Sequence, residues 1–218
     1  MAQNTLTPTE RTRVKRGHKR ANYDRETIYS ILDATPLCHI GFLRDERPSI
    51  IPTLQWRKGD YVYWHGSRAS AALLSSANAD ICLTVTLLDG MVMARSAFHH
   101  SVNYRSVVLY GKPEQVTDPD VKAEKLKDMI DVIYPGRWEH LRPMLAKEVK
   151  ATGILSMKIN EASAKIRTGM PEDDKEDYEL PIWAGVIPLV NQQLEPLSDP
   201  RNLDGVEVPE HLKNFRIE

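Results

Sequence analysis

Strand-like segments that follow one another with few helical segments between them constrain the fold most. Each is a short apolar run rich in Val, Ile, Leu, Thr or aromatic residues, and turn residues separate one run from the next. The runs cover residues 37–43, 49–56, 61–64, 80–88, 91–98, 106–116, 151–159 and 182–187. No regular alternation of strands with long helices is present, as a parallel sheet would need. The pattern predicts a mainly β fold, an antiparallel barrel with short peripheral helices.

Particular residues refine this expectation for three of the segments. Pro52 lies within residues 49–56 and cannot donate a hydrogen bond to a neighbouring strand. This strand is therefore at an edge, has a bulge, or leaves its backbone facing a ligand. Asp89 and Gly90 are a strong signal for a two-residue hairpin turn between the runs on either side of them. Residues 163–168 are expected to continue irregularly after the strand before them.

Two polar clusters stand at the ends of strands within residues 61–111, the most informative stretch of the chain. The first contains His65, Gly66, Ser67, Arg68 and Ser70, and the second contains His99, His100, Ser101, Asn103, Tyr104, Arg105 and Ser106. Hydroxyl groups, backbone N–H groups and a cation together are what a phosphate-bearing ligand needs. The first cluster could equally be a strand-to-helix connection with a serine cap. Arg105, just inside an apolar strand, needs an anion, either a protein carboxylate or a ligand phosphate.

The usual catalytic and nucleotide-binding motifs are absent from the sequence. It contains no GxSxG, GxGxxG, GxxxxGK(S/T) or CxxC pattern. His99 and His100 are adjacent, so on a strand they point to opposite faces and rarely bind one metal together. We predict no metal site and identify no catalytic residue from these patterns.

Composition and charge exclude several classes of protein. The chain has 29 basic and 30 acidic residues among its 218, and its net charge of −1 gives no sign of a nucleic-acid partner. No apolar run approaches the roughly 18–20 residues of a membrane helix, and the N-terminus has no apolar signal core. Cys38 and Cys82 lie in apolar runs and are interpreted as buried hydrophobic residues in a reduced compartment. We therefore expect a soluble cytoplasmic protein.

Three regions differ in composition. Residues 1–22 form a basic N-terminal arm, in which six of the ten residues from 11 to 20 are Lys or Arg. We expect this arm to be solvated and mobile or packed on a partner subunit, with a basic patch for nucleic acid or an anionic cofactor as the alternative. Residues 23–190 form one domain, and residues 191–218 form a proline-rich tail of turns. The expected helices lie at residues 24–34, where Asp24 can act as the cap, and at 67–77 and 119–132.

Several segments taken in order resemble one known family. They read RPSIIPTLQW, YVYWHGSRAS, HHSVNYRSVV, SAKIRTG and WAG. Over residues 20–190 the chain resembles the pyridoxamine 5′-phosphate oxidase-like family of FMN-binding proteins. It looks closest to a bacterial branch often called flavin-nucleotide-binding proteins, which is related to the nitroimidazole-resistance reductases. The resemblance implies an antiparallel split β-barrel that forms a homodimer and binds FMN at the subunit interface, in agreement with the strand pattern.

The same resemblance places a flavin site on this sequence. The isoalloxazine ring would lie against residues 50–53, where Pro52 leaves strand backbone free for a flat ligand. The phosphate would be held by residues 65–70 and 104–106. The partner subunit would supply Trp183, which could otherwise be a core or interface tryptophan. The expected cofactor-binding residues are Ile50, Ile51, Pro52, Thr53, His65, Gly66, Ser67, Arg68, Ser70, Asn103, Tyr104, Arg105, Ser106 and Trp183.

The function implied by the resemblance is that of an FMN-dependent oxidoreductase of unknown substrate, in which the flavin carries the electron chemistry. His65 and His99 are candidates to donate a hydrogen bond to the flavin or to a substrate anion. An alternative is a flavin or haem carrier or sensor without turnover, in which His99 or His100 ligates iron. A further alternative is a structural or nucleic-acid partner that acts through residues 11–20.

Overall fold

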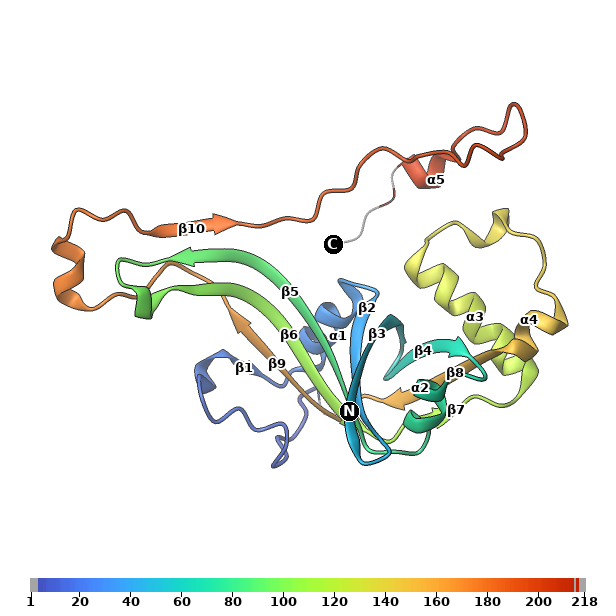
Figure 1. Cartoon of the computed structure of the whole chain (residues 1–218), viewed down its shortest axis with the longest axis horizontal. Helices are drawn as coiled ribbons and strands as arrows, with labels where there is room; N and C mark the ends of the chain where they lie inside the picture. Colours follow the sequence, from blue (N-terminus) through green and yellow to red (C-terminus); the bar gives the residue numbers. More distant parts are fainter. Residues whose placement is uncertain (1–3, 214, 216–218) are drawn as a thin grey trace.

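A single sheet dominates the computed structural model, which describes residues 4–213 and 215 (Figure 1). Within these residues the strands are β1 (Ala21–Asn22), β2 (Leu37–Arg44), β3 (Arg47–Lys58), β4 (Tyr61–Ser67), β5 (Ile81–Met93), β6 (Ser101–Gly111), β7 (Glu114–Gln115), β8 (Thr152–Lys158), β9 (Glu161–Arg167) and β10 (Gly185–Pro188). Their order is β1-β9-β6-β5-β2-β3-β4-β8-β7, β10 pairs with β5, and every pairing is antiparallel. The α-helices are α1 (Arg25–Asp33), α2 (Ala71–Ser76), α3 (Pro119–Ile133), α4 (Ala146–Ala151) and α5 (Glu210–Lys213). This arrangement confirms the predicted antiparallel β fold with short peripheral helices.

Helix α1 begins where the sequence predicts, because Asp24 caps it. The Asp24 carboxylate accepts a hydrogen bond from the backbone N–H of Thr27 at 3.0 Å. The buried residues Ile28, Ile31 and Leu32 recur at helical spacing, so one face of the helix packs against the barrel.

Alternate residues of the strands fill the barrel interior, and a smaller cluster lies on the outer side of the sheet. The interior strand residues include Cys38, Ile40, Leu83, Val85, Val107, Leu109, Leu155 and Met157. The outer cluster consists of Trp56, Tyr63, Leu126, Ile133 and Ile154, and it lies where α3 covers β3, β4 and β8. The barrel therefore has a packed core, and α3 gives it a second packed layer on one side only.

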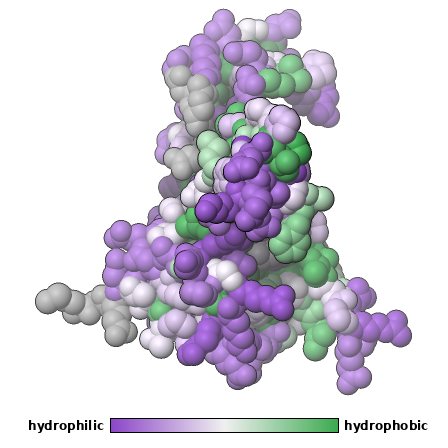
Figure 2. Space-filling model, turned by 90° about the vertical axis from the view of Figure 1, so that its left-hand side faces the viewer, coloured by the Kyte–Doolittle hydropathy of each residue, from purple (hydrophilic) through white to green (hydrophobic). Residues whose placement is uncertain are grey.

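The long strands β5 and β6 leave the barrel and run on as a curved pair beside β10 (Figure 1). We call this extension, residues 87–105 and 168–189, the arm; it is a different segment from the basic N-terminal arm at residues 1–22. Several large apolar side chains of the arm are exposed, among them Phe98 at 89%, Met170 at 70% and Trp183 at 68%. Viewed from the tip of the arm, hydrophobic groups lie between hydrophilic ones on the surface (Figure 2). Exposed apolar groups in this number indicate a surface made to contact something else.

The hairpin turn predicted at Asp89 and Gly90 is wrong, because β5 continues through both residues. The register between β5 and β6 shifts at this point, which marks a β-bulge. A Cβ at Gly90 would lie 3.1 Å from the carbonyl oxygen of Ile187, so the glycine allows β10 to approach closely. The chain reverses later, at residues 94–100, before β6 begins. An Asp-Gly pair fits a bulge as well as a turn, and pairing with β10 and β6 decides between them.

The segment at residues 163–168 also differs from its prediction. It belongs to β9, which pairs with β6 along seven residues and with the short β1. Its alternation is hidden in the sequence because Ala162, Ser163 and Ala164 are small and all three are buried. Small residues on both faces of a strand remove the period-two signal on which the prediction depended.

The described part of the basic N-terminal arm packs on its own chain. Leu6 and Thr12 are buried, with 6% and 2% of their surface exposed. The guanidinium of Arg11 donates to the carboxylate of Asp80 at 2.6 Å and to that of Glu161 at 3.2 Å. Burial and ion pairing thus hold this region against β9 and the start of β5, and its basic residues are partly neutralised within the chain.

Candidate functional site

Strand β3 has only one partner along the part that carries Pro52. Its ladder with β2 covers residues 47–54, whereas its ladder with β4 begins only at Gln55. Pro52 lies opposite His39 of β2, and no strand among the described residues pairs with its other side. Of the three alternatives that the sequence left open, the structure shows a local edge, where the missing N–H of proline costs no ladder hydrogen bond.

Alternation along β3 separates the four residues expected to contact the isoalloxazine ring. Ile51 packs against the barrel core, and Thr53 lies opposite the buried Cys38, so both face inward. Ile50, which is 72% exposed, and Pro52 face outward. Only the second pair can therefore present side chains to a ligand outside the barrel.

Tyr104 and Ser106 of β6 also face outward, because Val107 and Leu109, which alternate with them and point to the opposite face of the strand, fill the core. Both side chains are partly exposed. We call the outward-facing side chains of Ile50, Pro52, Tyr104 and Ser106 the open face. Strands β5 and β2 separate its two hydroxyl-bearing residues on β6 from its two apolar residues on β3.

The Ser106 hydroxyl donates to the carbonyl of Lys165 at 3.3 Å, and Asn103 and Arg105 also have partners within the chain. The Asn103 side chain donates to the carbonyl of Gly169 at 3.1 Å and accepts a hydrogen bond from Arg167. The Arg105 guanidinium donates to the carboxylate of Asp89 at 2.9 and 3.1 Å. The structure thus supplies the anion that Arg105 needs as a protein carboxylate. The assignment of Arg105 to a flavin phosphate, which the resemblance implies, is the alternative to a structural role in this ion pair.

The first polar cluster forms the connection from β4 to α2. The backbone N–H of Ser70 donates to the carbonyl of Ser67 at 2.8 Å, and that of Arg68 donates to the carbonyl of Ala151 at 2.9 Å. A Cβ at Gly153 of β8 would lie 3.4 Å from the Cα of Arg68, so the glycine allows this close approach. The loop is held in place from beneath and exposes its serine hydroxyls and the Arg68 side chain.

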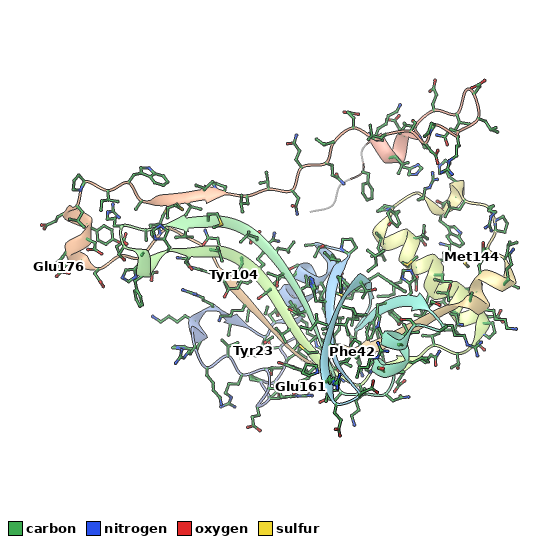
Figure 3. The ribbon with its side chains drawn as sticks, viewed as in Figure 1. Tyr23, Phe42, Tyr104, Met144, Glu161 and Glu176 are labelled. Atoms are coloured by element: carbon green, nitrogen blue, oxygen red, sulfur yellow. The ribbon has the colours of Figure 1, made fainter. Side chains whose placement is uncertain are left out.

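The two polar clusters do not meet within one chain. Strands β5, β2 and β3 lie between β6, which carries the second cluster, and β4, which carries the first. In Figure 3, Tyr104 on the side of the arm is far from Met144, which lies beside the helices that cover β4. Trp183 is exposed on the arm, where its ring packs over Gly185. A site that uses all of these residues therefore needs a second copy of the chain.

A cavity of about 780 Å³ lies where α3, α4 and the segment between them face the end of β4. It is lined by Arg68, Thr117, Pro119, Asp120, Lys122, Ala123, Trp138, Pro143, Met144, Ala146, Val149 and Lys150. Apolar side chains predominate, three of the residues are cations and one is a carboxylate. The Lys122 ammonium donates to the carbonyls of Val149 and Thr152 at 3.2 and 3.0 Å, which ties α3 to α4 and β8.

His65 is not among the residues that line this cavity, and it lies on the outer side of β4, on the same face as Tyr63. Its ring centroid is 6.1 Å from that of Trp56, whose ring in turn stacks on Tyr63 at 5.6 Å. Met144 packs against the same cluster and also lines the cavity. The Nδ1 atom of His65 is buried and has no hydrogen-bond partner. Burial lowers the pKa of the imidazole from its ordinary value, so the ring is neutral near pH 7.

The histidines at the arm are placed differently. The Nε2 atom of His99 is 3.4 Å from the Asp174 carboxylate, and the Nδ1 atom of His100 is 2.8 Å from the carbonyl oxygen of Ser96. Both residues are near the tip of the arm. Among the described residues, no group of three or more His, Cys, Asp or Glu side chains could hold a metal ion.

Apart from Arg68, sequence reasoning did not find the residues that line the cavity. The others come from residues 117–150, where the pattern gives a helix and turns but no chemical motif. Trp138 within PGRW is the one local signal, since a tryptophan in a polar turn needs an apolar surface to contact. None of the described helices is long and apolar enough to cross a bilayer.

Comparison with known proteins gives consistent results. A model of the family described as pyridoxamine 5′-phosphate oxidase matches residues 24–166. The structure is similar to the flavocytochrome Anf3 from Azotobacter vinelandii, with 52% identity, a TM-score of 0.94, and coverage of 98% of this chain and 100% of that chain. It is also similar to a FAD and haem binding protein from Mycobacterium smegmatis, with 36% identity, a TM-score of 0.85, and coverage of 88% and 95%. No curated protein matches.

A 5-nitroimidazole antibiotic resistance protein from Bacteroides thetaiotaomicron shares the fold, at 18% identity and a TM-score of 0.56 over 67% of this chain and 86% of that chain. The family match covers more than half of the sequence and includes both polar clusters and Pro52. These findings confirm the resemblance and the split-barrel fold that it implied. The chain belongs to the pyridoxamine 5′-phosphate oxidase-like family.

Proposed function

We propose that this chain is an electron-transfer protein of the flavocytochrome type, a homodimer that binds one flavin and one haem per protomer. The observation that carries the proposal is the 52% identity to the Azotobacter flavocytochrome over 98% of this chain. The Mycobacterium protein, described as binding FAD and haem, supports the same pair of cofactors. In the sequence analysis haem was an alternative to flavin. We now propose that the protein binds both.

The open face fits the flavin ring. A flat aromatic ligand needs an apolar surface with few unsatisfied donors, and the free edge of β3 at Pro52 lacks the N–H that any other residue type would have there. Ile50 is exposed and available for contact with the ring. Tyr104 and Ser106 of β6, which β5 and β2 separate from β3, offer hydroxyl oxygens for the polar parts of the cofactor, and the Ser106 oxygen can still accept a hydrogen bond while it donates to Lys165.

The proposed homodimer follows from the separation of the two polar clusters. In a dimer with a twofold axis, one group of residues on each protomer can contact the other group on its partner. Two groups that are separated within one chain can therefore form two equivalent sites across the interface. Ser67, Arg68 and Ser70 of one protomer would then hold the flavin phosphate beside the open face of the other. The exposed apolar side chains of the arm, including Trp183, supply contact area for such a partner.

The proposed cofactors and the residues of the chain have different roles. Flavin and haem supply one- and two-electron chemistry when bound. The residues of the chain bind and orient them, exclude water and set the surrounding charge. On this basis we assign the protein to the oxidoreductases. Neither polar cluster identifies its substrate. Cys38 and Cys82 are both free, as expected of a cytoplasmic protein.

The flavin is either FMN, as the family resemblance implies, or FAD, as the description of the Mycobacterium protein favours. Both share the ring and the first phosphate, so the open face and the residues near Arg68 serve either. Chromatography of the flavin released by acid, before and after phosphodiesterase treatment, distinguishes them, because only FAD is converted to FMN.

The absorption spectrum of the purified protein tests the proposal. We expect two flavin bands in the blue and near-ultraviolet together with an intense haem Soret band, which shifts on reduction with dithionite. The haem content is measured as the pyridine haemochrome and the flavin content after acid release. A protein that lacks both cofactors, and takes up neither haemin nor flavin on reconstitution, would refute the proposal.

A further inference from the structure

We infer that the cavity between α3 and α4 is the haem site and that His65 is an axial ligand of the iron. The inference rests on the proposed function, because haem binding is part of it. It goes further by assigning the place, the ligand and the residues that surround the ring. It also differs from the haem alternative drawn from the sequence, in which His99 or His100 ligates iron.

The cavity has the size and lining that a haem needs. Its volume of about 780 Å³ lies within the range of about 300–1,000 Å³ that is usual for cofactor pockets. Trp138, Met144 and Val149 give it apolar walls from three separate segments. A planar macrocycle is mostly apolar, so such walls stabilise it by removing its surface from water.

His65 provides the nitrogen that the cavity itself lacks. Its side chain projects from β4 on the same side as Tyr63, since residues two apart on a strand share a face. A buried imidazole nitrogen without a partner is unfavourable unless a ligand or water satisfies it. Neutral imidazole is the commonest protein ligand of metals and the usual proximal ligand of haem.

The charges around the cavity suit a dianionic cofactor. Lys150 is exposed where it lines the cavity, and Lys122 adds a second cation that is already held by two carbonyl groups. Arg68 also lines the cavity, but it is assigned above to the flavin phosphate. Asp120 is the one carboxylate in the lining. Haem carries two propionate groups, which pair with cations at the opening of a pocket while the ring remains in the apolar part.

The other described histidines near apolar surface are less suited to bind iron. His140 and His211 stack on each other with their ring centroids 4.5 Å apart and their planes at 19°. Two stacked rings present their faces to each other, so they cannot place nitrogens on opposite sides of one iron. His99 and His100 contact Asp174 and the carbonyl of Ser96. The Nε2 atom of His211 is also buried without a partner, but His211 lies in the C-terminal tail. His65 is favoured because it lies next to Trp56, whose cluster contacts Met144 of the cavity lining.

The assignment also places the two cofactors on one side of the same strand. Pro52 and Trp56 both point outward from β3, and four residues of strand separate them by about 13 Å. The Trp56 ring is next to His65. A flavin on the open face and a haem beside His65 are therefore neighbours, joined by Leu54 and Trp56, as electron exchange between them requires.

The test compares His65→Ala with His100→Ala, each purified from cells supplied with a haem precursor. We expect the His65→Ala protein to retain its flavin and its far-ultraviolet circular dichroism but to lose the Soret band, and added imidazole to restore haem binding. The His100→Ala protein should have the wild-type ratio of haem to flavin. Should His65→Ala fail to fold, His65→Met supplies a different ligand and should give a shifted Soret band in a folded protein.

The outcomes separate this inference from the proposal on which it rests. Wild-type protein that binds no haem after reconstitution would overturn both. Wild-type protein with haem, together with a His65→Ala protein whose Soret band and haem content are unchanged, would overturn only the assignment of His65. A His65→Met protein with an unshifted Soret band would do the same. Loss of haem from the His100→Ala protein but not from the His65→Ala protein would show that the iron ligand is His100, in the arm.

Discussion

The pair formed by Arg105 and Asp89 allows a structural role to be separated from a cofactor-binding one. The sequence shows only that Arg105 needs an anion. In the structure its Nε and Nη2 atoms donate to the Asp89 carboxylate at 3.1 and 2.9 Å. Replacing Arg105 by alanine should therefore destabilise the arm, where β5 is bulged, and should leave flavin affinity almost unchanged.

The size of the effect follows from the exposure of the pair. Hydrogen bonds between charged groups contribute about 1.5–3 kcal/mol when they are sheltered from water, and fully exposed ion pairs contribute about 0–1 kcal/mol. The two side chains are 38% and 29% exposed, between these limits. We expect Arg105→Ala to lower the free energy of unfolding by about 1 kcal/mol, which lowers the Tm of a chain of this length by about 2–4 °C.

A double-mutant cycle measures the interaction directly. Arg105→Ala, Asp89→Ala and the double variant are compared by urea unfolding, and flavin affinity is measured by fluorescence titration of each apoprotein. We expect a coupling energy of about 0.5–1 kcal/mol and three flavin affinities equal to that of the wild type. Flavin binding weakened by about tenfold or more in Arg105→Ala, with Asp89→Ala unaffected, would show that the essential anion is the ligand phosphate.

Two further predictions concern stability. Gly153→Ala places a Cβ 2.2 Å from a buried methyl group of Leu73 and should cost about 1–3 kcal/mol, whereas Gly66→Ala, directly opposite in the sheet, meets Leu73 only at 3.6 Å and should cost much less; equal thermal shifts would contradict this. The hydrogen bond from Arg11 lowers the pKa of the Glu161 carboxyl, so its stabilising effect is present above the unfolded pKa and is lost as the pH falls through the folded value. Glu161→Gln should therefore lose less stability than the wild type between pH 7 and pH 3, and identical losses in urea unfolding would refute the linkage.

Much of the fold could be predicted because its signals are local. The cap at Asp24 and the helix after Asp118 depend on neighbouring residues, and both appear where the sequence indicates. Most apolar runs are strands, but the run 91–98 is not a strand of its own, because β5 continues to Met93 and the chain reverses before β6 begins at Ser101. The bulge at Asp89 and Gly90 was misread as a turn, because only pairing with β6 and β10 distinguishes the two. The small residues of β9 likewise carried no period-two pattern.

The candidate site was less predictable, because it depends on distant contacts. The sequence identified Pro52 and both polar clusters as unusual. It could not show that three strands separate those clusters, or that Asp89 neutralises Arg105. His65 was placed with the phosphate-binding residues because it precedes them in the sequence. Its relation to the cavity depends on α3 and α4, which are more than fifty residues further along the chain.

Native mass spectrometry of the purified protein tests the central claim most directly, because one measurement reports the oligomer and everything bound to it. The account predicts a dimer whose mass exceeds that of two chains by two flavins and two haems. Gentle activation should release monomers that have lost their flavin, since each flavin contacts both protomers. A monomer that retains a full complement of flavin, or a dimer that carries neither cofactor, would contradict the account.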